Sequence, residues 1–573
     1  MAYHILFYWG YNKMPINNYY IKDKKAILYV NIKKPLNNDH EDNPGLVEIF
    51  EQQNTARRTL YVNQCGYDAD KSKRFTATNI KSGTTFYLRK KATDEIVFTG
   101  EINNQIGDFT TFKNNTDEEF YIECNNRKSY AFKIQNNYIS SLSTPLAIKF
   151  MEMSRQDAFD IGGNTGYAWR DGHQFSFELN SLVMMYMANP SYYETLPYDV
   201  YKVDECEYTE LQTQNEPNII WLIKFGVTRY YDWCTNHGIT LHAFIKGQLA
   251  YFLYLYPYIT NYVTQEFYEQ IRDFTIQQWS VETCNKSWYD INMNHNLFTT
   301  QEVIGTVKGQ LPPGYAIVPN LMMWEVAKRD NLANAQDFFN AAYNNMNWLI
   351  NDVDLNNPSY TKGQRMSEYI TVHSLTYFYE MYPDLCPAGT YEKILNLAKL
   401  YISRSNNLWD YRQYQTKGDL SNATSTIWVN EETTGGLCNQ PGNVAGFMGI
   451  AYSLARVITD DTINKRLKEL AVSHIDHVYG RNPHGRHFCY TAKDEFDGAD
   501  FNWAKRYDGG LGNLGYCIGV LDGSPKEESY PYNPDADTGY TEGWVAFNTA
   551  WNMSLAYLAA THSNDGLGIF SKQ

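Results

Sequence analysis

Residues that could do chemistry gather in three loop-like clusters of the chain. The first spans 162–173, where glycines surround Trp169, Arg170, Asp171 and His173. A glycine-rich loop can bring a carboxylate close to a ligand. A helix cap with a structural salt bridge would produce the same composition, so this cluster alone leaves both interpretations open.

The second cluster, 480–487, contains two arginines and two histidines: Arg481, His484, Arg486 and His487. Such side chains are costly to bury unless anionic or hydroxyl groups satisfy them. A ligand rich in hydroxyl or anionic groups would do so, and a solvated loop is the alternative.

The third cluster, 535–544, directly precedes the last predicted helix and places Glu542 between Tyr540 and Trp544. An apolar environment can raise the pKa of a carboxyl group, which a general acid requires. The alternative is a carboxylate that interacts with the positive end of the helix dipole.

The elements that must position these clusters are predicted to be helices. Over 218–234, apolar residues recur with a helical period, while Lys224 and Arg229 fall outside the apolar stripe. The same pattern predicts further helices over 177–187, 241–255, 267–279, 319–327, 335–350, 367–381, 391–402, 444–457, 460–479 and 545–560. A closed helical barrel with elaborated loops at one end fits this number of helices.

Ahead of the helices, short runs of high β-propensity predict a small β-sandwich that ends near residue 143. The predicted strands are 60–64, 74–78, 85–88, 96–98, 120–122 and 130–134. Residues 1–58 are polar and predict an extension of uncertain order, with one strand at 26–32.

Four segments, in this order, resemble motifs of glycoside hydrolase family nine. Residues 60–67 (LYVNQCGY) are similar to the opening of its first domain, and 217–226 (PNIIWLIKFG) to one of its helices. Residues 479–485 (YGRNPHG) and 545–548 (VAFN) are similar to its GRNPFG and closing motifs. The resemblance implies a mainly α fold: an immunoglobulin-like β-sandwich at 59–143, then an (α/α)6 barrel catalytic domain at 144–573.

The resemblance also implies a reaction, inverting hydrolysis of a β-linked glycan or oligosaccharide in the manner of an endoglucanase. Inversion requires a protonated carboxyl at the glycosidic oxygen and a carboxylate that activates water on the opposite face. Glu542 is the predicted acid and Asp171 the predicted base. The remaining residues of the three clusters are predicted to bind substrate: Trp169, Arg170, His173, Arg481, His484, Arg486, His487, Tyr540 and Trp544.

Two departures from the family pattern leave alternatives open. His173 stands about where the family has a second Asp, and Trp544 occupies the position of the family's acid, two residues after Glu542. Loss of the second Asp would suit phosphate-dependent cleavage, or a catalytically silent carbohydrate-binding protein. Glu178, Glu431 and Glu432 are further carboxylates that could face the cleft.

Metal chemistry and other partner classes have weaker support. His474 and His477 lack a third ligand at suitable spacing, so core or helix-surface histidines are expected. Asp352 and Asp354 could contribute to a structural calcium site, but no cofactor is expected to be required. The formal net charge of -15 argues against nucleic acid or an anionic membrane surface as the main partner. Residues 1–11 lack the marks of a signal peptide, so a cytoplasmic location is expected, with secretion as the alternative.

Overall fold

The computed structural model describes residues 60–160, 178–196, 213, 215–284, 293–302, 311–356, 368–412, 441–482 and 545–571, together with four strands near the N-terminus. The chain divides into two compact units, 1–59 and 60–573. In the first unit, β1 (Leu6–Trp9) pairs with β2 (Asn12–Pro15), and β3 (Asn18–Lys22) pairs with β4 (Lys25–Tyr29), both antiparallel. The sequence predicted one strand here, at 26–32, and β4 covers its first part.

The second unit begins with a small β-sandwich. Its larger sheet has the strand order β5-β12-β10-β7-β8, with β11 on β10, and its smaller sheet pairs β6 with β9. Aromatic side chains such as Phe75, Phe86 and Phe109 fill the core. The strands are β5 (Gly66–Asp68), β6 (Arg74–Thr76), β7 (Thr85–Lys90), β8 (Ile96–Glu101), β9 (Ile106–Asp108), β10 (Glu119–Cys124), β11 (Arg127–Lys128) and β12 (Phe132–Gln135).

The predicted strand at 60–64 is wrong. Only Tyr61 forms a bridge, with Thr76, and the rest of the segment turns toward the helices, where the Gln64 backbone N–H donates to the Tyr479 carbonyl at 2.8 Å. The run is apolar because it is buried between the sandwich and the barrel. The predicted domain ranges, 59–143 for the sandwich and 144–573 for the barrel, stay predictions.

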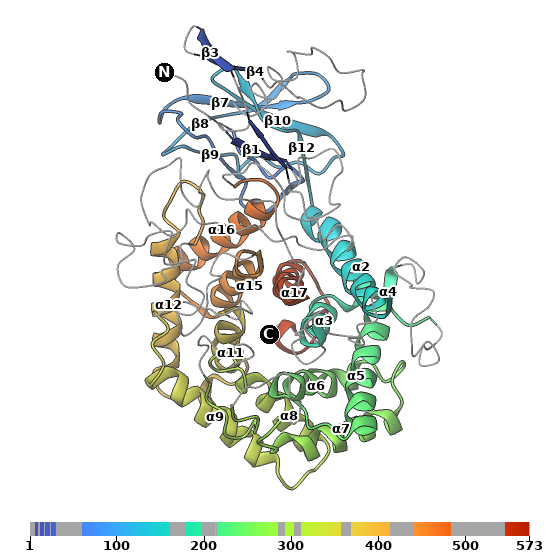
Figure 1. Cartoon of the computed structure of the whole chain (residues 1–573). Helices are drawn as coiled ribbons and strands as arrows, with labels where there is room; N and C mark the ends of the chain where they lie inside the picture. The colour runs from blue at the N-terminus through green and yellow to red at the C-terminus, as the bar shows by residue number, and fades with distance from the viewer. Residues whose placement is uncertain are drawn as a thin grey trace. The chain divides into compact units, whose positions relative to one another are not determined.

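The helices form two concentric rings (Figure 1). Within the described residues, each inner helix packs against the next, and the ring closes where α17 packs against α3. The inner helices are α3 (Glu178–Ala188), α6 (Ala243–Leu255), α8 (Ile317–Arg329), α11 (Glu368–Met381), α15 (Pro441–Val457) and α17 (Val545–Ala560). The outer helices are α2 (Tyr138–Asp160), α5 (Asn218–His237), α7 (Gln265–Trp279), α9 (Ala335–Asn351), α12 (Thr390–Arg404) and α16 (Asp461–Val478). This alternation is that of an (α/α)6 barrel, as predicted.

Burial explains which helices lie in which ring. An inner helix touches neighbours on every side, and in α6 every residue except Tyr254 is buried. An outer helix needs one apolar face, and α9 buries Phe338, Ala342, Met346 and Leu349 at helical spacing. Shorter helical segments complete the described part: α4 (Pro190–Thr195), η3 (Tyr256–Tyr258), η4 (Pro383–Leu385) and η8 (Gly568–Phe570).

The helix α2 is absent from the sequence prediction. Its first turns carry several hydroxyl side chains and Pro145, which lies inside the helix. Proline removes a helical hydrogen bond and hydroxyl groups compete for backbone partners, so this segment looks like a loop by local signals. In the described part of the chain, we find no helix that is both long and apolar enough to cross a membrane.

Candidate active site

The two ends of the barrel differ in the length of their connections. Most inner helices pass to the next outer helix through a short connection, such as 330–334 after α8 or 458–460 after α15, whereas 189–217 after α3 is long and contains α4. An outer helix passes to an inner helix through a long one, such as 161–177 before α3 or 479–544 before α17, with 238–242 before α6 as the exception. Short connections join antiparallel neighbours, so all inner helices begin at the same end. Long loops on a rigid scaffold commonly carry function, which makes this end the candidate site.

The predicted catalytic residues belong to two of these long connections. Asp171 precedes α3 and Glu542 precedes α17, and these two inner helices pack against each other. Both residues lie outside the described residues, so their separation stays untested. The same holds for the predicted binding residues of these connections other than Arg481: Trp169, Arg170, His173, His484, Arg486, His487, Tyr540 and Trp544.

Arg481 is the one predicted binding residue that the structure describes, and its predicted role is wrong. Its side chain is fully buried, and its Nη2 donates to Asp410 Oδ2 at 2.8 Å. Its Nε donates to Thr76 Oγ1 at 3.1 Å, and its Nη1 to Ser473 Oγ at 3.3 Å. These protein groups satisfy the guanidinium, which therefore has a structural role and is not a subsite residue.

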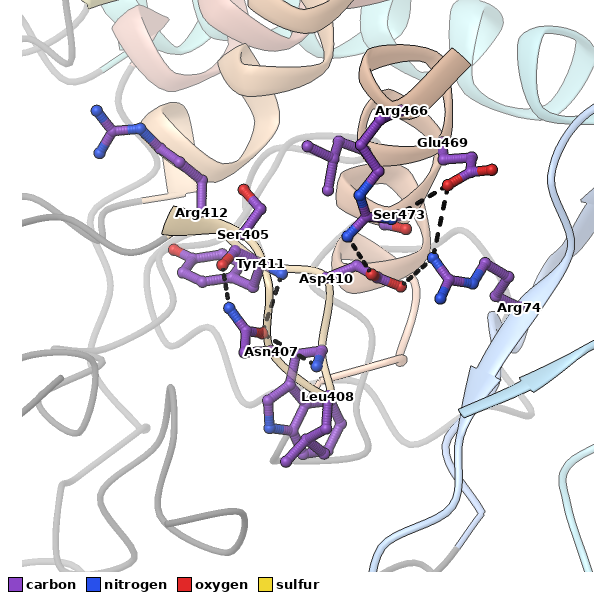
Figure 2. Close-up of polar contacts among 12 residues, drawn as sticks. Arg74, Ser405, Asn407, Leu408, Asp410, Tyr411, Arg412, Arg466, Glu469 and Ser473 are labelled. Carbon is purple, nitrogen blue, oxygen red and sulfur yellow. Dashed lines mark hydrogen bonds and ion pairs between the residues drawn. The ribbon is translucent and has the colours of Figure 1, made fainter. Parts of the chain in front are cut away.

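Asp410 is the centre of this buried cluster (Figure 2). It follows α12, and its carboxylate also forms ion pairs with Arg74 of β6 at 2.8 Å and with Arg466 of α16 at 2.7 Å. Burial alone would raise the pKa of Asp410, but the positive charges of Arg481, Arg74 and Arg466 outweigh it and hold this pKa well below its usual range. Asp410 therefore stays ionised at any pH at which the protein would function.

A second buried ion pair lies at the start of inner helix α11. The Arg412 guanidinium donates to Glu368 Oε1 at 2.7 Å, and the Tyr401 hydroxyl donates to the same oxygen at 3.0 Å. Arg412 also lies over the Tyr401 ring, 4.7 Å from its centroid. Arg412 directly precedes 413–440, so the pair fixes the start of this connection against α11. Sequence reasoning missed it, because Glu368 and Arg412 are far apart in the chain and belong to no motif.

A small polar cavity lies within the inner ring. It has room for about one water molecule. Asn180 Oδ1, Tyr369 Oη and His373 Nε2 are buried there, and none has a hydrogen-bond partner among the described residues. Burial lowers the pKa of His373 to about 3, so its ring is neutral. The cavity is lined by Asn180, Tyr251, Tyr315, Val318, Pro319, Tyr369, Ile370, His373, Ser374 and Met553.

The histidines and aspartates considered for metals have ordinary roles where they are described. His474 and His477 are core residues, and both rings stack on Tyr411. Asp354 Oδ1 accepts hydrogen bonds from the backbone and side chain of Asn356, as in a polar loop. A calcium ion near Asp354 stays a prediction.

The additional carboxylate candidates receive little support. Glu178 is the first residue of α3. Residues 179–187 of this helix are all buried in the inner ring. Glu431 and Glu432 lie outside the described residues.

Comparison with known proteins supports the fold independently. Residues 55–121 match a family model described as the cellulase N-terminal ig-like domain. Among curated proteins, none matches the sequence significantly.

Several solved structures share the fold. A GH9 protein of Bacteroides ovatus is 11% identical with a TM-score of 0.51, over 88% of this chain and 100% of that one. A metagenome-derived family nine endoglucanase is 11% identical with a TM-score of 0.53, over 87% and 99% of the chains. The AaCel9A protein, solved in complex with cellobiose-like isofagomine, is 10% identical with a TM-score of 0.54, over 87% and 99%. These likenesses confirm the predicted resemblance to glycoside hydrolase family nine in its fold: an immunoglobulin-like domain followed by an (α/α)6 barrel.

Proposed function

We propose that this protein is a cellulase-type glycoside hydrolase that cleaves a β-linked glycan with inversion. One observation carries the proposal: α3 and α17 are neighbours in the inner ring, and each follows a connection that contains a candidate catalytic carboxylate. The fold shared with family nine endoglucanases over most of the chain supports the same reaction class.

In the proposed reaction, Glu542 donates a proton to the glycosidic oxygen while Asp171 removes a proton from the attacking water. Water then adds to the anomeric carbon from the opposite face as the bond to the leaving sugar breaks. Glu542 precedes Val545, the first residue of α17, by three positions in the sequence. Aromatic residues of the same connections, Trp169, Tyr540 and Trp544, are proposed to stack on sugar rings.

The ligand side of the proposal is an oligosaccharide or polysaccharide. AaCel9A, which has this fold, was solved in complex with cellobiose-like isofagomine. The phosphate-dependent alternative would need cations to bind phosphate, and Arg481 is not free for this role because it is paired with Asp410. A cytoplasmic location and a structural calcium ion are retained as proposals.

A glycan screen tests the assignment with three proteins: wild type, Glu542→Gln and Asp171→Asn. We expect wild type to release reducing sugar from a β-linked glucan, and each variant to lose a factor of roughly 10² to 10⁴ in kcat, the usual effect of removing a positioned acid or base. Retained binding of the glycan by both variants would show that the loss is chemical.

Other outcomes of the screen decide among the alternatives. Sugar release that depends on added phosphate would favour phosphorolysis. Binding without turnover in all three proteins would favour a silent carbohydrate-binding protein, and equal turnover in all three would reject both catalytic residues.

A further inference from the structure

Two segments of the barrel meet the β-sandwich just before two of the long connections continue toward the next inner helix. The first, 405–412, follows α12 and leads into 413–440; the second, 479–482, follows α16 and leads into 483–544. We call them the two stems. Both contact β6 and the residues before it, and their contacts include hydrogen bonds and ion pairs.

A single hydroxyl group of the sandwich joins the two stems. Thr76 in β6 is fully buried. Its Oγ1 donates to the Leu408 carbonyl of the first stem at 2.8 Å and accepts from Arg481 Nε of the second stem at 3.1 Å. Thr76 therefore makes a hydrogen bond with each stem at the same time.

Arg74, two residues earlier on the same strand, makes a parallel link. Its guanidinium forms an ion pair with Asp410 of the first stem at 2.8 Å (Figure 2). The same carboxylate oxygen accepts a hydrogen bond from Arg481 of the second stem at 2.8 Å. Residues 61–64, which precede β6, also contact both stems. The Tyr61 ring packs edge-on against Trp409 with centroids 5.0 Å apart, and the Gln64 N–H donates to the Tyr479 carbonyl.

The second stem leads directly into predicted substrate-binding residues. His484, Arg486 and His487 follow Arg481 within a few residues, so their reach is set by where the second stem ends. Catalytic geometry is sensitive at this scale, because a displacement of about 1 Å far from the reacting atoms can cost roughly 10² in rate.

We propose that Thr76 and Arg74 of the β-sandwich are positioning residues for the proposed glycan cleavage, since they fix both stems from which the 413–440 and 483–544 connections depart. The inference rests on the proposed function for its reaction and goes beyond it by assigning the sandwich a part in that reaction. The competing explanation is that the contacts only stabilise the fold.

The sharpest variant is Thr76→Val, which keeps the shape of the side chain and removes both hydrogen bonds. Its matched control is Thr275→Val in α7, a threonine equally buried whose hydroxyl donates to the Ile271 carbonyl, away from the stems. Hydrogen–deuterium exchange of full-length protein should show roughly tenfold faster exchange in peptides covering 408–412 and 479–482 for Thr76→Val, because local opening costs less when a buried hydrogen bond is lost. The control should leave both peptides unchanged.

Steady-state kinetics on the glycan identified by the screen give the second measurement. We expect Thr76→Val to lower kcat about tenfold with KM within about twofold, as loss of transition-state geometry predicts, while Thr275→Val leaves kcat unchanged. Arg74→Met should act in the same direction. Arg74→Lys should lose less kcat than Arg74→Met, because lysine keeps the positive charge. The recovery should be partial, because an ammonium group cannot replace the planar guanidinium.

Each result decides something. Unchanged exchange at either stem in Thr76→Val would overturn the proposal, and so would faster exchange with unaltered kcat. If Thr275→Val loses as much stability and as much kcat as Thr76→Val, the effect is general destabilisation, and this result would also overturn the proposal. A wild-type protein without turnover would reject the proposed function, and the exchange measurement, which needs no substrate, would still show whether Thr76 holds both stems.

Discussion

A carboxylate surrounded by three arginines is the strongest charged feature among the described residues. Asp410 is almost completely buried, and replacing it with Asn would leave the guanidinium groups of Arg74, Arg466 and Arg481 without their shared counter-charge. We expect Asp410→Asn to lower the free energy of unfolding by about 3–5 kcal/mol, since an uncompensated buried charge is costly. Urea unfolding monitored by tryptophan fluorescence would measure this change in the free energy of unfolding.

The control for this prediction is Asp117→Asn on the sandwich surface. Asp117 pairs with Lys133 but is exposed, so solvent screens the pair and little change is expected. If the two variants lose equal stability, or if Asp410→Asn is neutral, the buried cluster does not stabilise the fold as described.

Arg481 illustrates what a single sequence can reveal about individual residues. Its place in a family motif and its neighbours suggested a substrate contact, whereas its partners Asp410, Thr76 and Ser473 are brought to it by the fold. Nothing in the local sequence distinguishes a guanidinium that binds a sugar from one that binds a buried aspartate. Local pattern can nominate a charged residue, but its partner is set by contacts between distant segments.

At the scale of elements, the helical period was a reliable guide. The eleven predicted helices correspond to eleven of the long helices, and the ends differ by a few residues, as with 218–234 against Asn218–His237. The β-strands were harder, because β5, β9 and β11 are two or three residues long and carry no alternation that could be recognised. The sequence analysis did not separate the inner helices from the outer ones. In the structure the inner helices are apolar on all sides.

Close packing of two inner helices supplies a test of the ring. A Cβ atom on Gly449 of α15 would lie 3.2 Å from Ser554 Oγ and 3.3 Å from Ser554 Cα of α17. The Gly449 N–H also donates to Ser554 Oγ at 2.8 Å. We expect Gly449→Val to lower the free energy of unfolding by about 1–3 kcal/mol through overpacking, despite the poor helix propensity of glycine.

Thermal unfolding followed by circular dichroism at 222 nm would measure this change. Gly449→Ala is the graded companion, and we expect it to be less destabilising than Gly449→Val because only one methyl group must be accommodated. A stabilised Gly449→Val would mean that α15 and α17 are farther apart than the contacts indicate.

The pH dependence of stability is a property of the whole molecule, because buried ionisable groups of several elements contribute with opposite signs. Burial lowers the pKa of His295 to about 4 and of His373 and His474 to about 3. Between these values and about 6.5 the unfolded chain binds more protons than the folded one, so these histidines make stability rise with pH. Burial raises the pKa of Asp68 to about 6 and of Asp476 to about 7. In the folded state these carboxyl groups therefore keep protons that the unfolded chain releases. They make stability fall as the pH rises from about 4 to about 7.

The histidines and the carboxyl groups therefore act in opposite directions between pH 4 and 6.5. Asp476→Asn isolates the opposing contribution. Its side-chain oxygen can still accept the hydrogen bond that Asn63 Nδ2 donates to Asp476 Oδ1 at 3.0 Å, but it carries no proton to lose. The variant should therefore resemble wild type near pH 4 and become more stable than wild type toward pH 8, where the buried carboxylate of wild type is ionised. A difference between the two proteins that is constant with pH would show that Asp476 does not titrate in this range, and the burial of its carboxyl group where the sandwich meets α16 would have to be reconsidered.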